Sequence, residues 1–294
     1  MGAILYYLVY GITWILSLLP LKIMYVFSDF IYLLLYYFPS YRRMIVAENL
    51  KNSFPEKSEK ELKCIEKRFY HHLADLFIED FKLIHMSSTQ LEKRCVFTNP
   101  ELVNKLYEQN RDVAAIMGHY GNWEWLVTLP LHSKYKFISI YKPIQNKLFN
   151  RFMNNIRTRY GMYTSPMSHI IKQIITDRNN NVRTFSSFIS DQSPVKEDIK
   201  YWMPFLNQDT PVYLGAEKIA SKYDMAVVFL NVQKVKRGYY TATFELLFDH
   251  TKGLPEHLIT ETHVKRLEEI IMEKPEYWLW SHRRWKHKRP VSNE

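Results

Sequence analysis

Cysteine is nearly absent from the sequence. Its 294 residues include only Cys64 and Cys95, and neither belongs to a C-x-x-C pair. Two such cysteines cannot build a disulfide framework or a structural zinc site, so a reducing compartment is expected. The sequence also has no internal repeat and no low-complexity linker. Its length is compatible with one domain preceded by an appendage.

Several motifs of catalysis and cofactor binding are missing as well. No G-x-S-x-G elbow, H-E-x-x-H pair, P-loop or G-x-G-x-x-G segment occurs. The adjacent His71 and His72 lack metal-ligand spacing, so neither a metal site nor a cofactor is expected. Because the sequence has no elbow serine, and no cysteine close to a histidine, direct attack by an acceptor hydroxyl is favoured over a covalent enzyme intermediate.

Basic and aromatic residues, by contrast, are abundant. The chain has 40 Lys and Arg against 30 Asp and Glu, a formal net charge of +10, and 15% of its residues are aromatic. This combination is typical of proteins that bind a membrane surface, a nucleic acid or an acidic protein. The tail HRRWKHKR would suit a nucleic acid, but the apolar start of the chain argues against that partner.

The first forty residues are strongly apolar. Residues 2–19 carry no charge and fall just short of the roughly 20 residues that span a bilayer. A second run, residues 23–38, is followed by Arg42 and Arg43, a pair that marks the cytoplasmic side of a membrane. We expect residues 1–39 to form a membrane anchor of one span plus an interfacial helix, ahead of a main domain at 40–294.

Three other interpretations of this N-terminus are less favoured. A cleaved signal peptide needs a basic segment and a small-residue cleavage site, and the sequence has neither. A buried hairpin of a soluble protein would not explain the Tyr and Trp residues, which suit the headgroup region of a membrane. Two spans instead of one is the third alternative.

Residues 41–86 have a helical pattern. The pattern breaks at Pro55, and Ser58 is the expected cap of a long amphipathic helix. Beyond residue 99 the pattern changes, because short apolar runs alternate with helical segments. These runs lie at 112–118, 136–142, 182–190 and 225–233.

This alternation predicts an α/β fold with a mixed, largely parallel sheet flanked by helices, behind the helical membrane-anchoring segment. Residues 238–248 alternate like an antiparallel edge strand. A loop is expected after residue 190, ahead of a helix at 212–223, and the last helix is expected at 260–274.

Polar residues directly follow three of the predicted strands. His119 follows the first, Lys142 the second, and Asp191 and Gln192 the third. In open α/β sheets, ligands bind outside the carboxyl ends of the strands. The sequence therefore predicts that a base, a cation and a carboxylate lie together at one edge of the sheet.

The segment GHYGNWEWL places His119 and Glu124 five residues apart. If the chain turns at Gly118 and Gly121 and a helix begins near Asn122, Glu124 can reach back to the imidazole. A carboxylate bound to one ring nitrogen leaves the other nitrogen to take a proton from a hydroxyl. The alternative is a helix N-terminus with a favourable acidic residue and a capping histidine.

Seven sequence blocks, in one order along the chain, resemble the late lipid A acyltransferases of the glycerolipid acyltransferase superfamily. HYGNWE matches the Glu form of the superfamily's H-x4-D/E motif. The other blocks are the apolar N-terminus, NLKNSFPEKSEKE, YKPIQNKLFNRFMNNIRTRYG, SDQSP, PFLNQDTPVYLGAEKIA and PEYWLWSHRRWK. Such enzymes move a fatty acyl chain from acyl carrier protein, or sometimes coenzyme A, to a hydroxyl of a lipid at the inner membrane.

The resemblance implies catalytic roles for several residues. His119 is the general base, Glu124 its orienting partner, Arg157 or Arg159 the catalytic-site arginine, and Asp191 the family's aspartate. The two arginines lie two apart on a predicted helix, about 200° from each other around its axis, so they do not face one site together. We favour Arg157 as catalytic and place Arg159 among the substrate-binding residues.

Lys142, Gln192 and Asn122 complete the expected substrate-binding residues. The family usually has Y-R-P where this chain has Tyr141, Lys142 and Pro143. Lysine keeps a point charge for a phosphate but lacks the bidentate fork of arginine. Gln192 and Asn122 are explained equally well as structural turn residues.

The expected protein is a membrane-associated acyltransferase at the cytoplasmic face of the bacterial inner membrane. It would move an acyl chain from acyl carrier protein or coenzyme A to a lipid A precursor, with residues 40–294 as its acyltransferase domain. A positive net charge suits both lipid phosphates and the acidic carrier protein. The same chemistry on an aminolipid or glycolipid, and a catalytically silent lipid-binding protein of the same fold, are the alternatives.

Overall fold

The computed structural model describes residues 3–38 and 41–290. Residues 1–2 and 39 of the predicted anchor, and residues 40 and 291–294 of the predicted main domain, lie outside the described ranges. The helices are α1 (Ala3–Leu16), α2 (Leu21–Tyr37), α3 (Arg43–Ser53), α4 (Glu59–Lys82), α5 (Ser88–Glu92), α6 (Pro100–Glu108), α7 (Lys147–Thr158), α8 (Ile170–Asn179), α9 (Gly215–Tyr223) and α10 (Leu258–Glu273). Three short 3-10 segments are η1 (Trp123–Leu131), η2 (Lys196–Asp198) and η3 (Pro275–Tyr277). The strands are β1 (Cys95–Phe97), β2 (Val113–Met117), β3 (Lys136–Tyr141), β4 (Tyr163–Pro166), β5 (Thr184–Ile189), β6 (Tyr201–Phe205), β7 (Gln208–Val212), β8 (Ala226–Lys236) and β9 (Tyr239–Phe248).

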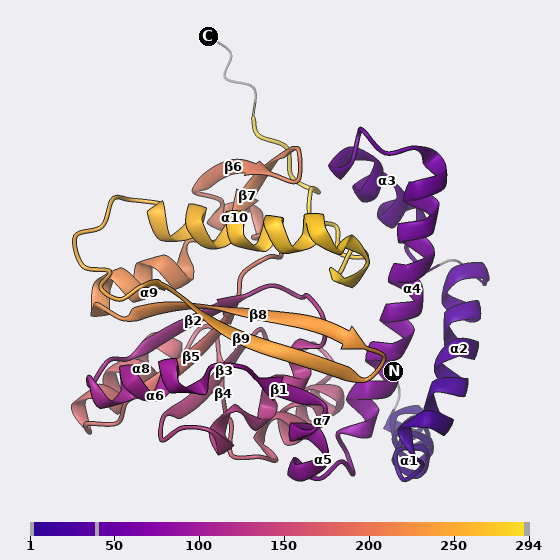
Figure 1. The fold of residues 1–294 in the computed structure, drawn as a ribbon, viewed down its shortest axis with the longest axis horizontal. Coiled ribbons are helices and arrows are strands. Elements are labelled where there is room, and N and C mark those ends of the chain that lie inside the picture. The colour runs from indigo at the N-terminus through magenta and orange to yellow at the C-terminus, as the bar shows by residue number, and fades with distance from the viewer. Residues whose placement is uncertain (1–2, 39–40, 291–294) are drawn as a thin grey trace.

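A seven-stranded sheet in the order β1-β9-β8-β2-β5-β3-β4 forms the centre of the molecule (Figure 1). The pair β8–β9 is antiparallel and the other pairs of this sheet are parallel. The predicted α/β fold with a mixed, largely parallel sheet is therefore confirmed. Strand β9 is antiparallel as predicted, but it is not an edge strand, because β1 pairs with its outer side. The predicted loop after β5 contains η2 and the antiparallel pair β6–β7.

Strand β2 shows how the sheet divides the core. All five of its residues are buried, and successive side chains point to opposite faces. Val113, Ala115 and Met117 pack in the cluster that includes residues of α6, α7 and η1. Ala114 and Ile116 pack with residues of α8 and α9 on the other face. A parallel strand covered by helices on both sides is expected to be this uniformly apolar.

Helix α4 runs beside the sheet and begins where the sequence predicts. Ser58 accepts a hydrogen bond from the N–H of Glu61, and the Glu61 carboxylate accepts one from the N–H of Ser58 at 2.8 Å. These reciprocal bonds form a capping box, which satisfies two main-chain donors of the first turn. Helix α2 lies along α4 (Figure 1), and its Leu21 and Met24 are buried in the core of the main domain.

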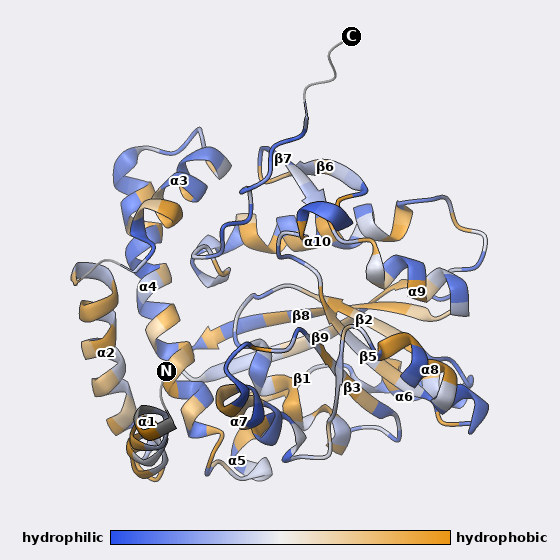
Figure 2. Ribbon diagram, turned by 180° about the vertical axis from the view of Figure 1, so that it is seen from behind, coloured by the Kyte–Doolittle hydropathy of each residue, from blue (hydrophilic) through white to orange (hydrophobic). Residues whose placement is uncertain are grey.

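The predicted anchor corresponds to α1, with 14 residues, and α2, with 17. Within residues 3–38 and 41–290, no helix combines the length and hydrophobicity of a membrane crossing, which does not match the predicted span. Both helices are nevertheless largely apolar (Figure 2) and expose apolar side chains. These include Ile4, Leu8, Ile12 and Ile15 on α1 and Ile23, Val26, Phe30 and Leu33 on α2.

Candidate functional site

The chain turns sharply between β2 and η1, as the two glycines predict. Gly121 has a φ of +62°, and a Cβ there would lie 3.0 Å from the main-chain oxygen of Val232. A Cβ on Gly118 would lie 2.7 Å from the side chain of Leu267. Glycine is required at position 121, for the left-handed conformation and the close approach of the main chain, whereas a side chain at position 118 would displace that of Leu267.

The C-terminal segment, residues 277–279, contacts this turn. The N–H of Gly121 donates to the carbonyl of Tyr277, and the N–H of Leu279 donates to the carbonyl of His119, each at 3.1 Å. Tyr120 and Trp278 form an antiparallel bridge. These contacts fix the main chain from His119 to Gly121.

His119 and Asp191 form a close pair across neighbouring strand ends. Nδ1 of His119 lies 2.7 Å from Oδ1 of Asp191, and the main-chain N–H of His119 donates to Oδ2 at 2.8 Å. The indole N–H of Trp278 also donates to Oδ2, at 2.8 Å. An ionised carboxylate only accepts hydrogen bonds, so the imidazole proton lies on Nδ1 and Nε2 is left as the basic nitrogen.

The environment of Asp191 keeps its carboxyl ionised. Burial alone would raise its pKa, but the charge and hydrogen bonds of His119, together with the Trp278 bond, lower the pKa to about 2. Trp278 belongs to the PEYWLW block, but the sequence prediction gave it no role. It lies 87 residues from its partner, and no periodic pattern connects the two positions.

Glu124 does not bind His119, contrary to the prediction. It lies in the first turn of η1, as expected, but its carboxylate accepts both Nε and Nη2 of Arg157, with Nε 2.9 Å from Oε2. Asp191 from the neighbouring strand already occupies the ring nitrogen that Glu124 was expected to bind. Burial would raise the pKa of Glu124, but Arg157 outweighs burial and lowers it.

Arg157, in the last turn of α7, and Arg159, directly after the helix, point in different directions, as their spacing predicts. Arg157 lines the main cavity, whereas Arg159 donates to the carbonyls of Leu83, at 2.6 Å, and Ile84. Arg159 therefore satisfies carbonyl groups at the C-terminal end of α4. It lines a smaller cavity of about 290 Å³ beside α1 instead of the expected substrate site.

Asn122 is also turned away from the cavity. Its side chain caps η1, because Oδ1 accepts the N–H of Trp125 at 3.2 Å, and Nδ2 donates to Oε2 of Glu79 at 2.7 Å. The residue is 1% exposed. The structure thus places Asn122 as a turn residue, the second of the two explanations that its sequence position allowed.

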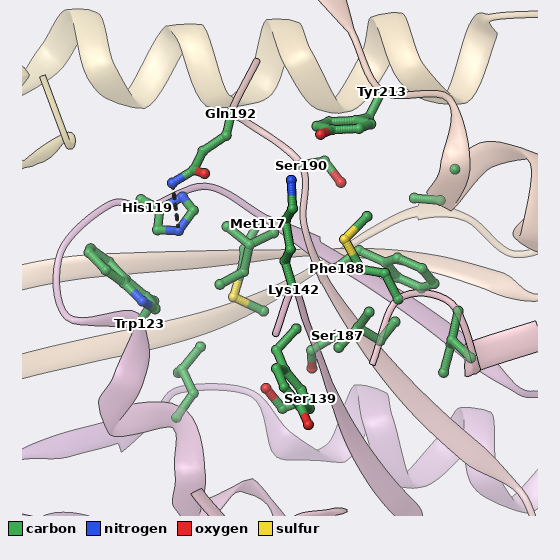
Figure 3. A pocket seen from close by; sticks show the side chains of 18 of the residues that line it. Met117, His119, Trp123, Ser139, Lys142, Ser187, Phe188, Ser190, Gln192 and Tyr213 are labelled. Carbon is green, nitrogen blue, oxygen red and sulfur yellow. Dashed lines mark hydrogen bonds between the residues drawn. The ribbon is translucent and has the colours of Figure 1, made fainter. Parts of the chain in front are cut away.

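A cavity of about 660 Å³ opens at the carboxyl ends of β2, β3 and β5. His119, Lys142 and Gln192 lie on its polar side, and Nε2 of Gln192 is 3.4 Å from Nε2 of His119 (Figure 3). Its size falls within the range of about 300–1,000 Å³ that is usual for ligand pockets. Much of the remaining lining is apolar and includes Met117, Leu126, Ile140, Met167, Ile170 and Phe188.

The predicted meeting of a base, a cation and a carboxylate at one edge of the sheet is confirmed. His119, Lys142 and Asp191 come from the ends of three strands, and Glu124 with Arg157 lines the same cavity as His119. Within the described ranges 3–38 and 41–290, no group of three or more His, Cys, Asp or Glu residues is arranged to hold a metal ion.

The sequence profile of the bacterial lipid A biosynthesis acyltransferases matches residues 2–287, nearly the whole chain. A comparison with curated proteins finds no match. The matched region includes the H-x4-E segment, α7 and the strand end that carries Asp191. The chain therefore belongs to the bacterial lipid A biosynthesis acyltransferase family, and it is an acyltransferase.

Proposed function

We propose that the protein transfers a fatty acyl chain from a thioester of acyl carrier protein or coenzyme A to a hydroxyl of a lipid A precursor. The observation that carries this proposal is the His119–Asp191 pair at the edge of a largely apolar cavity. The pair provides a base with one free nitrogen, and the apolar lining provides room for an acyl chain.

His119 acts as the general base. Its Nε2 takes the proton of the acceptor hydroxyl while the oxygen attacks the thioester carbonyl carbon. The tetrahedral intermediate then collapses, the carbon–sulfur bond breaks, and the thiolate takes the proton from the imidazolium. Asp191 keeps the ring in the productive tautomer and stabilises the imidazolium, the role that was expected of Glu124.

Lys142 and Gln192 are the donors best placed to act on the substrates. Both line the cavity beside His119 (Figure 3), and the Gln192 amide lies 3.4 Å from Nε2 of the base. A donor at that distance suits the oxyanion of the intermediate, and the Lys142 ammonium suits a lipid phosphate. Glu124 and Arg157 form an ion pair that lines the cavity, and the position of each side chain depends on the other.

The apolar face of α1 and α2 supports binding to the cytoplasmic surface of the bacterial inner membrane. Its side chains are exposed to solvent in the isolated chain, and contiguous apolar surface of this kind marks an interaction site. The net charge of +10 favours a surface of anionic lipids. In this arrangement α1 and α2 lie in the interface, and the acceptor lipid reaches the cavity from the same membrane.

The proposal is tested by mass spectrometry of lipid A from cells with and without the gene. Loss of one acyl chain is expected, and the wild-type gene, but not one encoding His119→Ala at equal protein level, should restore it. A missing acyl chain on an aminolipid or glycolipid instead would move the acceptor to that class. Unchanged lipids throughout would contradict acyl transfer, and parallel assays with purified acyl carrier protein and coenzyme A thioesters identify the donor.

A further inference from the structure

Helix α4 carries a stripe of buried polar residues. His72, Asp75 and Glu79 are spaced by three and four residues, which places them on one face of the helix. Their exposed fractions are 2%, 0% and 0%. Buried charged groups need partners, so the contacts of this stripe show what it holds.

Glu79 is fully engaged in hydrogen bonds. Its Oε2 accepts Nδ2 of Asn122 and the hydroxyl of Tyr240, each at 2.7 Å, and its Oε1 accepts the hydroxyl of Tyr25 at 2.8 Å. Its main-chain carbonyl accepts the indole N–H of Trp125 at 3.3 Å. One residue of α4 therefore contacts α2, β9 and the segment that follows the turn.

The Glu79 carboxylate determines how the Asn122 amide lies. A carboxylate can only accept, so the NH2 group of Asn122 must face Glu79 and the amide oxygen must face the other way. That oxygen accepts the N–H of Trp125 and so caps η1. The first turn of η1 carries Glu124, whose partner is Arg157.

His72, in the same stripe, contacts Gly121, the residue of the turn that precedes Asn122. Nε2 of His72 lies 3.3 Å from the carbonyl oxygen of Gly121, and Nδ1 lies 3.3 Å from Nζ of Lys234. Burial and the neighbouring Lys234 hold the pKa of His72 well below its usual range. A neutral ring that accepts from Lys234 at Nδ1 donates to Gly121 through Nε2–H.

We propose that Glu79 is a positioning residue for acyl transfer, because its carboxylate orients Asn122 and thereby fixes the turn that carries His119 and the first turn of η1. The proposal rests on the proposed function, in which His119 is the base. Glu79 does not line the cavity, so it acts through Asn122 and not on the substrate. Displacement of a catalytic group by about 1 Å can lower a rate by about a hundredfold.

A charge exchange tests this link. Asn122→Asp places a carboxylate against that of Glu79, and we expect kcat per folded molecule to fall by about tenfold to a hundredfold, with KM changed less than about threefold. Glu79→Gln alone keeps an acceptor for Asn122 and should lower kcat by less than about threefold. In Asn122→Asp/Glu79→Gln, the glutamine amide donates to the new carboxylate, so most of the lost kcat should return.

Ser28→Ala is the matched control. Ser28 donates to Oδ1 of Asp75 at 2.8 Å, so this variant removes a buried hydrogen bond between α2 and the same face of α4 without a direct contact to the turn. We expect it to lower the thermal midpoint and leave kcat unchanged. An equal loss of kcat in Ser28→Ala, or no rescue in the double variant, would overturn the positioning role.

If Asn122→Asp does not fold, a second pair of variants tests the same link. Asn122→Ala removes the bonds of the amide, and addition of Glu79→Ala should lower kcat no further if both act through one contact. A further loss of kcat when Glu79→Ala is added to Asn122→Ala would contradict the proposal. His119→Ala in the same assay separates the proposed function from the role of Glu79, because wild-type activity of His119→Ala refutes the proposed function. An inactive His119→Ala beside a fully active Asn122→Asp refutes only the role of Glu79.

Discussion

The carboxylate of Asp191 binds both the imidazole and the main-chain N–H of His119, at 2.7 and 2.8 Å. The bond to the main-chain N–H fixes the carboxylate relative to the backbone of His119, and the bond to Nδ1 fixes the ring relative to that carboxylate. Rotation of the His119 side chain would break the bond at Nδ1. Nε2 is thereby held toward the cavity without help from a substrate. A base that is oriented in advance requires little reorganisation during the reaction.

Removal of the imidazole should abolish most of the activity. We expect His119→Ala to lower kcat by about a hundredfold to ten-thousandfold, the usual contribution of positioned proton transfer. Lipid binding should change little, since the apolar lining is intact. Acyl transfer and thermal midpoint are measured on one preparation. A purely capping role predicts a different result, a stability loss of about 0.5–2 kcal/mol with activity per folded molecule preserved.

Asp191→Asn should be nearly as damaging as the loss of the histidine. The amide can donate to Nδ1 and so favour the tautomer that carries its proton on Nε2, where the base must be free. We expect kcat to fall on the order of a thousandfold or more. Glu124→Gln, measured in the same assay, should cost less than either change. The reverse order would return the orienting role to Glu124.

The stability of the protein should fall in acid partly because of Asp191. Its pKa is lowered from 3.8 to about 2, so its ionised form stabilises the fold above about pH 4, and this contribution is lost as the pH falls toward 2. Urea denaturation at pH 5 and pH 3 measures the loss. Asp191→Asn should show a smaller difference between the two pH values than the wild type does.

The Glu124–Arg157 pair should behave as a unit. Replacement of Arg157 with Met leaves a buried carboxylate without its partner, and loss of one member of a buried pair costs about 3–5 kcal/mol of unfolding free energy. Glu124→Leu/Arg157→Met should be less destabilised than the sum of the single changes. Chemical denaturation of the four proteins gives the coupling energy, and strictly additive losses would contradict a direct pair.

Arg159→Ala should separate the role of Arg159 from that of Arg157. Arg159 contacts the carbonyl groups of Leu83 and Ile84, directly after α4, and does not line the main cavity, so we expect kcat within about threefold of wild type, well below the tenfold that corresponds to 1.4 kcal/mol. Arg157→Ala is the comparison. Equal and severe losses of kcat in both folded variants would place Arg159 at the substrate after all.

The outer face of α1 is expected to contribute to membrane binding. Serine at four of the exposed apolar positions of this helix should weaken binding to vesicles that contain anionic lipids, because about 25 cal/mol per Å² of apolar surface favours removal from water. The thermal midpoint should not change. Residual binding through basic residues should decline as salt is added. The four positions are Ile4, Leu8, Ile12 and Ile15. Unchanged binding at high salt would point to another surface.

The sequence predicted strands where apolar runs were long and missed strands where they were short. Strand β1 has three residues, and β6 and β7 each contain a proline and partly exposed positions. Such strands lack the alternation that marks a strand in sequence. Without β1, residues 238–248 had no visible outer partner, and β9 was therefore placed at the edge.

The members of the candidate site were predictable, but their pairing was not. The rule for strand ends brought His119 and Asp191 to one edge, yet β3 and β4 lie between β2 and β5 in sequence. Only the strand order makes β2 and β5 neighbours and places the two residues in contact. Spacing favoured Glu124 instead, because local distance along the chain is the only distance that a sequence displays.

The contacts of the C-terminal segment with the turn have a consequence for biosynthesis. A chain emerges from the ribosome in order, and its early parts can fold before the later parts exist. The carbonyl of Tyr277 and the indole of Trp278, which complete the surroundings of His119, arrive long after β2 and α4. The sheet can assemble beforehand, but the nascent protein becomes competent for catalysis only after residues 277 and 278 have left the ribosome and packed against the turn.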